Sequence, residues 1–335
     1  MILVTGGTGL VGGHLLWHLL NENERVSAIC RKTSDPKPLH SVFSYYTSNP
    51  DDFLKRIDWR IADVLDETSI QEALVGVDVL FHCAAVVSLG NNSGSLMDTN
   101  VRGTRNVVQA ALKNRVAKFC FVSSIAACGR ASTGGKVDEN CKWNDSPHQS
   151  QYVISKYYSE QEVWKGIAKG LPAFIVNPGV ILGVSGTVTG SSQLFNQVQK
   201  GLIFYTNGGS GYVAVQDVVK AMILLSNSPV IGERFVLVGD NCSNKDILYW
   251  MADGFGKRRP FIRIGKRMLW TVGILSEFIG KVFHFSPLID RSTARSATRR
   301  EFYSAQKIEN TFGFQFTSIE KCIKEVCEFR NRTRY

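Results

Sequence analysis

The first thirteen residues constrain the fold of this chain more than any other stretch. A short apolar run, MILVT, is followed at once by GGTGLVGG, in which three glycines stand three residues apart at Gly6, Gly9 and Gly12. A strand that ends in such a turn and opens a helix can approach a pyrophosphate: the first glycine permits the turn, the second the close approach and the third the packing of helix on strand. The sequence therefore predicts a dinucleotide-binding unit, with phosphates at the loop and at the first helical residues, Leu10 and Val11.

The rest of the first half alternates short β-rich runs with helical ones. Strands are predicted at RVSAIC, IDWRIAD, VDVLFHCAA, AKFCFVSS and LPAFIVNPGVILG, and helices at 10–20, 66–74, 96–114 and through QSQYVISKYYSEQ. Strands that are separated by helices pair in parallel through right-handed crossovers. The predicted fold class is therefore α/β, with a Rossmann-type doubly wound parallel sheet.

Past residue 180 the pattern is less regular. Helices are expected at 191–200, 216–226, 244–255, 266–282 and 318–329, with a short strand at RFVLVG. We divide the chain into an NAD(P)-binding Rossmann domain, 1–180, and a smaller, mixed substrate-binding lobe, 181–335, some of whose segments return to the Rossmann sheet. Such a lobe would cover the carboxyl ends of the strands, where open α/β sheets bind their ligands.

Composition excludes several other classes of protein. A hydrophobic content of 44% with 20% charged residues is typical of a soluble globular protein. The N-terminus lacks the basic region and long apolar core of a secretory signal, so a cytoplasmic location is expected. The eight cysteines form no CxxC pair, which favours buried free thiols over a disulfide framework, and no metal site is expected.

The net charge of +10 is unevenly distributed, because residues 257–335 hold 17 Lys and Arg against 7 Asp and Glu. Such a region can be an ordinary solvated surface, or it can attract an anionic substrate, a membrane or a polynucleotide. The uncharged stretch MLWTVGILS, 268–276, is far shorter than the roughly 20 residues of a membrane span. No transmembrane segment and no nucleic-acid partner are expected, whereas peripheral membrane contact stays open.

Eight blocks of sequence, in order, resemble the extended branch of the short-chain dehydrogenase/reductase superfamily. They are TGGTGLVG, ADVLD, FHCAA, NVRGTRNV, FVSSIAACG, YVISK, NPGVILG and GYVAVQDVVKAM. This branch, the NAD-dependent epimerase/dehydratase family, includes nucleotide-sugar epimerases and dehydratases, dihydroflavonol reductases and 3β-hydroxysteroid dehydrogenases. The resemblance implies an NAD(P)-dependent oxidoreductase with a small-molecule substrate. It also implies a homodimer formed through a four-helix bundle.

The end of the second predicted strand bears on the choice of cofactor. An acidic residue there binds the 2′-hydroxyl of NAD, whereas a basic one accommodates the 2′-phosphate of NADP. This chain has Cys30 where NAD-using epimerases place Asp, followed by Arg31 and Lys32. A guanidinium can bind a phosphate through two hydrogen bonds. The sequence therefore favours NADP(H) over NAD(H).

Other cofactor contacts are implied by the resemblance alone. They involve the residue before the glycine turn, the position that binds the adenine edge, the small residues at the end of the fourth strand and the turn that orients the nicotinamide. The residues at these positions are Thr5, Asp63 with Val64, Ala84 with Ala85, and Pro178 with Gly179.

Tyr152 and Lys156 stand four residues apart, on one face of a predicted helix. A tyrosine hydroxyl can transfer the proton of carbonyl–alcohol interconversion if its pKa, about 10 in a model peptide, moves toward working pH. A cation one turn away would stabilise the phenolate. By resemblance the pair is catalytic, and Lys156 also binds the nicotinamide ribose. Ser124 (or, less favoured, Ser123) would polarise the substrate oxygen, and Asn100 would support the site.

Positions at which this chain departs from the family pattern bear on whether it is a dehydratase, an epimerase or a reductase. Ile125 and Ala126 stand where dehydratases carry an acidic pair, which disfavours dehydration. Residues 127–129 and 177–178 depart from the Val-Tyr-Gly and Arg-Pro of epimerases, which favours an NADP-dependent reductase of a ketone or aldehyde. A nucleotide-sugar epimerase with tightly bound cofactor and a non-catalytic cofactor-binding protein are the alternatives. No motif after residue 180 identifies the substrate.

Overall fold

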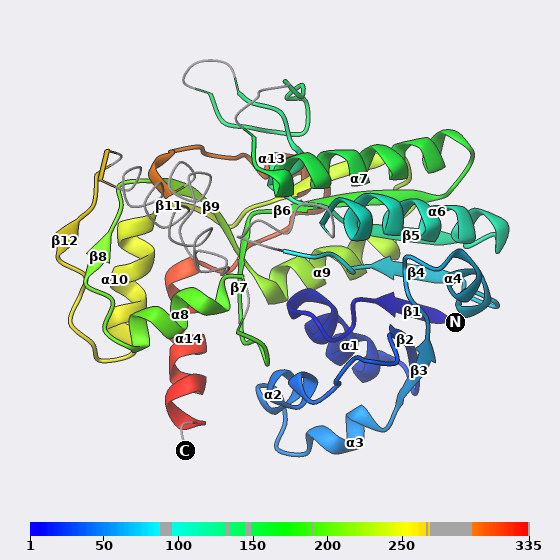
Figure 1. Cartoon of the computed structure of the whole chain (residues 1–335), viewed down its shortest axis with the longest axis horizontal. Coiled ribbons are helices and arrows are strands. Elements are labelled where there is room, and N and C mark those ends of the chain that lie inside the picture. The colour runs from blue at the N-terminus through cyan, green and yellow to red at the C-terminus, as the bar shows by residue number, and fades with distance from the viewer. Residues whose placement is uncertain are drawn as a thin grey trace, which may run out of the picture.

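The central element is a parallel sheet with helices on both faces, and a smaller lobe lies at one side of it (Figure 1). A computed structural model describes residues 1–87, 96–131, 135–144, 149–188, 190–265, 267–268 and 297–333. The sheet has seven strands in the order β10-β6-β5-β4-β1-β2-β3. In chain order they are β1 (Ile2–Thr5), β2 (Val26–Cys30), β3 (Ile57–Ile61), β4 (Val79–His82), β5 (Lys118–Val122), β6 (Ala173–Pro178) and β10 (Glu233–Leu237).

Two hydrophobic layers hold the helices to this sheet, because alternate strand residues point to opposite faces. Phe119 and Phe121 pack into one layer, and Cys120 and Val122 into the other. The first face is covered by α4 (Glu67–Ala73), α6 (Gly103–Lys113) and α7 (Gln151–Ala168). The second is covered by α1 (Leu10–Glu22), α2 (Pro38–Ser44), α9 (Val215–Ser226) and α13 (Gln306–Phe312), with α3 (Pro50–Leu54) beside α2.

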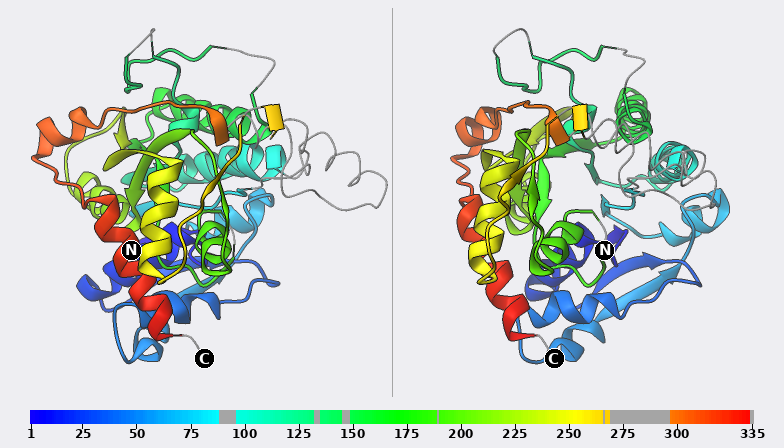
Figure 2. Two further views of the ribbon diagram at one scale, coloured as in Figure 1. Left: turned by 90° about the vertical axis from the view of Figure 1, so that its left-hand side faces the viewer. Right: turned by 60° about the vertical axis from the view of Figure 1, so that its left-hand side comes forward.

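The lobe has its own core. A three-stranded sheet, in the order β11-β9-β7, consists of β7 (Val180–Leu182), β9 (Gly209–Ala214) and β11 (Asp240–Ser243). It packs with α8 (Ser192–Gln199), α10 (Asn244–Gly254) and α14 (Ile319–Arg332), and Figure 2 shows α10 and α14 side by side. A pair of short strands, β8 (Phe204–Tyr205) and β12 (Ile262–Arg263), completes the lobe.

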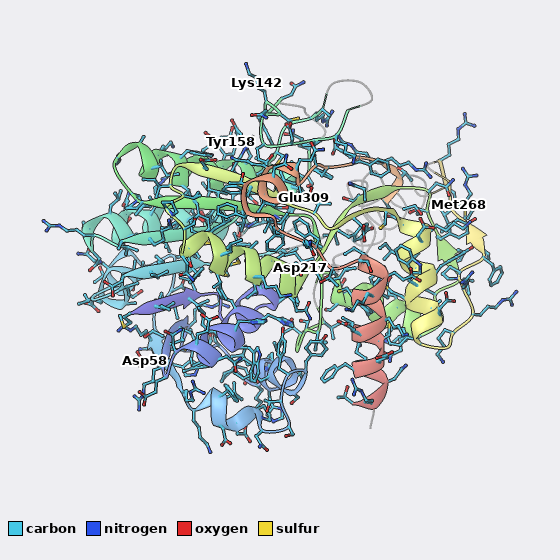
Figure 3. All side chains as sticks on the ribbon, turned by 180° about the vertical axis from the view of Figure 1, so that it is seen from behind. Asp58, Lys142, Tyr158, Asp217, Met268 and Glu309 are labelled. Atoms are coloured by element: carbon cyan, nitrogen blue, oxygen red, sulfur yellow. The ribbon has the colours of Figure 1, made fainter. Side chains whose placement is uncertain are left out.

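A buried carboxylate joins the lobe to the Rossmann part. Asp217 on α9 accepts hydrogen bonds from the backbone N–H of Thr317 at 2.7 Å and from its hydroxyl at 3.1 Å. Thr317 immediately precedes the N-cap of α14, so the start of this helix is fixed to α9, as the position of Asp217 in Figure 3 shows.

The predicted α/β Rossmann class is confirmed. The helices expected at 191–200, 216–226, 244–255 and 318–329 correspond to α8, α9, α10 and α14, and the RFVLVG strand is β10, which pairs with β6 along its length. The helix expected at 266–282 lies outside the described residues, apart from 267–268. The strands β7, β8, β9, β11 and β12 were not expected as separate sheets, because they are short and β9 begins in the glycine-rich run GGSG, which carries no alternating pattern.

Within the described residues, no helix has the length and apolar character that crossing a membrane requires. All eight cysteines are free thiols, and Cys120, Cys128, Cys242, Cys322 and Cys327 are buried.

Candidate active site

The glycine loop between β1 and α1 is packed so tightly that side chains are excluded. Gly6 has φ of +68°, and a Cβ there would lie 2.6 Å from the backbone nitrogen of Ala84 at the end of β4. A Cβ at Gly12 would lie 2.2 Å from the carbonyl oxygen of Gly6. The loop therefore requires glycine at both positions, and it brings its backbone against the carboxyl ends of β1 and β4.

The N-terminus of α1 is free to bind an anion. Its N-cap, Gly9, offers no side chain to the helix, and no acidic residue stands in the first turn. Within the described part of the chain, the N–H groups of Leu10, Val11 and Gly12 have no hydrogen-bond acceptor. Free N–H groups and the positive end of the helix dipole attract phosphate. The loop thus fits the pyrophosphate of a dinucleotide.

A hydrogen-bonded histidine fixes this loop to the neighbouring strand. In His82 the Nδ1 atom lies 2.7 Å from the hydroxyl of Thr5, and Nε2 lies 3.0 Å from the hydroxyl of Thr104. Thr5 also accepts a hydrogen bond from the N–H of Ala84 at 3.2 Å. Burial lowers the pKa of His82 to about 3, so the ring is neutral and its role here is structural.

The two cations after β2 lie at the same edge of the sheet as the glycine loop, because β1 and β2 are parallel neighbours. Arg31 and Lys32 are exposed, and neither pairs with a carboxylate among the described residues. Ser34 binds only the backbone of Arg31, through its hydroxyl at 3.2 Å. Both side chains are therefore available to a ligand.

Asp63 forms a turn after β3. Its Oδ1 accepts a hydrogen bond from the N–H of Leu65 at 2.9 Å, whereas the cap of α4 is supplied by Asp66. Val64 packs against Gly103, where a Cβ would lie 2.8 Å from the valine side chain. The second oxygen of Asp63 has no partner among the described residues, so it could still bind the edge of a base.

Asn100 joins β4 to α7. Its Oδ1 accepts from the N–H of Val86 at 2.8 Å, and its Nδ2 donates to the carbonyl of Val86 at 3.0 Å and to the hydroxyl of Ser155 at 3.0 Å. Ser155 in turn donates to the carbonyl of Tyr152 at 2.9 Å. The amide of Asn100 is fully occupied, and it supports the site from a π-helical turn, η1 (Asp98–Arg102), that precedes α6.

Ser124 and Tyr152 meet at the carboxyl end of β5. Burial raises the pKa of Tyr152, and a hydrogen bond from Ser124 opposes this rise. Ser124 is also the N-cap of the 3-10 helix η2 (Ile125–Ala127) and accepts from the N–H of Ala126 at 3.1 Å. Ser123 is instead bound to Glu160, so the structure favours Ser124 over Ser123 as the neighbour of the tyrosine.

Lys156 follows Tyr152 by one helical turn, and its ammonium is buried. The Nζ atom donates to the carbonyl of Val122 at 3.0 Å and lies 5.4 Å from the centre of the Phe121 ring. Burial lowers the pKa of Lys156 to about 8, against the opposing effects of Cys83 and Glu160. Because burial dominates, the pKa of Tyr152 is shifted upward, whereas the spacing predicts a shift toward working pH.

A buried carboxylate that the sequence analysis missed lies beneath these residues. Glu160 accepts hydrogen bonds at Oε2 from the hydroxyl of Ser123 and from Nδ2 of Asn177, both at 2.7 Å. At Oε1 it accepts from Trp164 at 3.3 Å and from Arg234 at 3.0 Å. Its side chain is 1% exposed and that of Arg234 is 19% exposed.

This network extends to Ser124, because Nδ2 of Asn177 also donates to the carbonyl of Ser124 at 3.0 Å. Asn177 is the residue that stands in place of the arginine in the Arg-Pro pair of epimerases. The position of Glu160, four residues after Lys156, could have identified it from sequence. Nothing in the sequence connects it to Arg234, which lies 74 residues away on β10.

Pro178 and Gly179 form the junction of the sheet and the lobe. Both are buried, and the N–H of Gly179 donates to the carbonyl of Leu237 at 2.9 Å. A Cβ at Gly179 would lie 2.5 Å from the carbonyl oxygen of Gly211 on β9. The chain therefore passes from β6 to β7 beside the site with no room for a larger residue.

The fold and the site together define a class of protein. A Rossmann sheet with a free phosphate loop at one strand end and a Ser–Tyr–Lys group at another is typical of NAD(P)-dependent oxidoreductases. The sequence model of the NAD dependent epimerase/dehydratase family matches residues 2–238. The chain belongs to this family, within the extended short-chain dehydrogenase/reductases.

Known relatives agree with this assignment. Sterol demethylase protein B of Methylococcus capsulatus is 30% identical over 84% of this chain and 82% of its own length. A protein of Synechocystis sp. with the provisional name dihydroflavonol 4-reductase is 27% identical over 96% of this chain and 92% of its own. The crystal structure of gox2253 is 29% identical, has a TM-score of 0.81 and covers 100% of this chain and 99% of that one.

Replacing Gly12 by alanine should disrupt the phosphate loop. The added Cβ cannot be accommodated 2.2 Å from the Gly6 carbonyl, so we expect the free energy of unfolding to fall by about 1–3 kcal/mol and dinucleotide binding to weaken. Urea unfolding and titration with NADPH measure the two effects. Gly265→Ala is the matched control, because its Cβ would meet nothing within 4 Å; equal behaviour of the two variants would contradict the prediction.

Proposed function

We propose that the protein is an NADP-dependent reductase that interconverts a ketone or aldehyde with the corresponding alcohol. The observation that supports this most directly is the contact of Ser124 with Tyr152 at the end of β5, with the buried ammonium of Lys156 one turn away. A nicotinamide dinucleotide, when bound, supplies or accepts the hydride. The glycine loop, Asp63 and Val64, Ala84 and Ala85, and Pro178 and Gly179 would hold it.

In the reducing direction Tyr152 donates its hydroxyl proton to the substrate oxygen, and in the oxidising direction it accepts that proton. The hydroxyl is protonated at neutral pH, as a proton donor must be, although burial raises its pKa and so moves it away from working pH. Ser124 donates a hydrogen bond to the same oxygen and so stabilises the charge that develops there.

Lys156 and Asn100 have supporting roles in this proposal. The Lys156 ammonium, held by Val122, lies beside Cys83 at the end of β4, where it can donate to the ribose hydroxyls of the cofactor. Asn100 is a positioning residue, because both ends of its amide are bound to Val86 and Ser155.

The preference for NADP rests on Arg31 and Lys32. We expect Arg31→Ala to weaken NADPH binding by about 10- to 100-fold, since a charge-assisted hydrogen bond contributes roughly 1.5–3 kcal/mol, and to leave NADH binding unchanged. Fluorescence titration with both cofactors measures this. Arg25→Ala, an exposed cation just before the start of β2, is the control. Tighter binding of NADH than of NADPH by the unaltered protein would refute the assignment.

A substrate screen separates the proposed reductase from the alternatives. The panel contains a dihydroflavonol, a 3-keto steroid, an aromatic aldehyde and UDP-glucose, and NADPH oxidation is followed by absorbance. Reduction of any carbonyl compound with net use of NADPH supports the proposal. Conversion of UDP-glucose without net use of cofactor would identify an epimerase, and binding without turnover of any compound would identify a non-catalytic protein.

The site and the surface bear on assembly and location. We propose a homodimer with α6 and α7 at the interface, because these helices lie side by side on one face of the sheet and Tyr158 on α7 is 46% exposed (Figures 1 and 3). We also propose that the protein is located in the cytoplasm. An anionic substrate would be compatible with the excess of positive charge in residues 257–335.

A further inference from the structure

One segment of the lobe has an unusual composition. Residues 257–268 read KRRPFIRIGKRM, with six Lys and Arg and no Asp or Glu. The segment follows α10, contains β12 and continues in the sequence into the uncharged stretch 268–276, which lies outside the described residues apart from Met268. The cations whose side chains are described are all exposed: Lys257, Arg258, Arg259, Arg263 and Arg267.

Apolar side chains are exposed among these cations. β12 pairs in parallel with β8, and Ile262 lies opposite Phe204, so their side chains share one face. The exposed apolar residues and their exposed fractions are Ile203 40%, Phe204 38%, Phe261 50%, Ile262 37% and Met268 51%. We call residues 203–205 with 257–265 and 267–268 the rim ribbon.

The rim ribbon lies at the outer edge of the lobe. In Figure 1 the two strands β8 and β12 form the margin of the molecule opposite β3, and Figure 3 places Met268 at the same edge. Backbone hydrogen bonds fix the ribbon: the N–H of Phe261 donates to Ile203 at 3.0 Å and the N–H of Ile264 to Tyr205 at 2.8 Å. The backbone that carries Phe204, Phe261 and Ile262 is therefore held by hydrogen bonds between the two strands.

Few of the cations are neutralised within the chain. Arg259 binds Asp253 through two hydrogen bonds of 2.7 and 2.8 Å, and Arg258 lies over the ring of Phe261, 4.2 Å from its centre. Lys257 and Arg267 have no carboxylate partner among the described residues. The ribbon thus carries a net positive charge and has apolar side chains between its charges.

We propose that the rim ribbon docks the protein reversibly on the surface of an anionic phospholipid bilayer. The lysines and arginines contact lipid phosphates, and Phe261, Ile262 and Met268 enter the boundary between headgroups and acyl chains. Charge complementarity favours an anionic surface, and exposed aliphatic side chains favour a bilayer over a nucleic acid. Phe204 and Phe261 offer rings on which a base could also stack, but Ile203, Ile262 and Met268 gain nothing from phosphate or bases, whereas a bilayer removes all five side chains from water.

Vesicle flotation tests this with the full chain. Vesicles of phosphatidylcholine mixed with phosphatidylglycerol should bind the protein, pure phosphatidylcholine vesicles should bind it much less, and added salt should weaken the binding. Arg258→Glu with Arg263→Glu should weaken binding by about tenfold or more. Lys136→Glu with Lys142→Glu, which makes the same change of charge in a loop elsewhere on the surface, should have a smaller effect.

A second experiment tests the contribution of the apolar side chains to vesicle binding. Phe261→Ser with Ile262→Ser leaves the charge unchanged and should also weaken vesicle binding, while the melting temperature shows whether the variant is folded. A labelled single-stranded RNA and a DNA duplex, titrated under the same conditions, are the competing partners. Failure to bind the anionic vesicles, an unchanged affinity of the folded serine variant, or tighter binding to either nucleic acid would each overturn the proposal.

Discussion

Tyr152→Phe is expected to reduce kcat/KM for the best carbonyl substrate of the panel by about 10²- to 10⁴-fold, the range of general acid catalysis. The ring and its packing remain, but the proton that Tyr152 donates to the substrate oxygen is lost, and Ser124 alone cannot replace it. NADPH oxidation measures the rate, and fluorescence titration should show that cofactor binding is nearly unchanged.

Tyr158→Phe is the matched control for this experiment. It removes a hydroxyl from the same helix, but Tyr158 is 46% exposed and points away from the sheet (Figure 3). Its activity should equal that of the unaltered protein. Retention of full activity by Tyr152→Phe would remove the tyrosine from the mechanism, and with it the proposed reductase chemistry at this site.

Glu160→Ala is expected to lower the free energy of unfolding by about 3 kcal/mol. Removing one member of a buried ion pair leaves the other charge uncompensated, which typically costs roughly 3–5 kcal/mol, and the partial exposure of Arg234 places the value at the lower end. The substitution also leaves Ser123, Trp164 and Asn177 without their acceptor. Urea unfolding measures the change.

Glu162→Ala controls for the loss of a carboxylate on the same helix. Glu162 is itself only 10% exposed, but it pairs with Arg105 and Lys165, whose side chains are 49% and 64% exposed. Water screens these pairs and solvates both cations when the carboxylate is removed, so the loss should be smaller, about 1 kcal/mol. Glu160→Gln keeps the shape of the side chain and one of its two acceptor oxygens. Its loss of unfolding free energy should therefore lie between the losses of the alanine variants at 160 and 162. Equal losses for the alanine variants at 160 and 162 would show that the buried network does not stabilise the fold.

Much of the fold could be predicted because it depends on local patterns. The glycine spacing after MILVT, the alternation of apolar strands with helices and the RFVLVG strand predicted the sheet that the structure has. The lobe was less predictable, since β7, β9 and β11 are short, β9 begins in a glycine-rich run, and each strand is stable only beside its neighbours.

The candidate site, like the fold, could be predicted from the sequence only in part. Motif spacing led to Ser124, Tyr152 and Lys156, and the structure places Ser124 against Tyr152. The spacing did not show that the ammonium of Lys156 would be held by Val122, because that bond depends on how closely α7 packs on β5.

The sequence by itself determined the class of fold, the position of the phosphate loop and the residue types at the candidate active site, because each depends on residues a few positions apart in the chain. Only the tertiary structure decided which charges and hydroxyls face one another. It joined Glu160 to Arg234 from a distant strand, assigned Ser123 and Ser124 to different partners and set apolar side chains among the cations of the rim ribbon. Such contacts depend on burial and on the pairing of strands far apart in sequence, which no local pattern encodes.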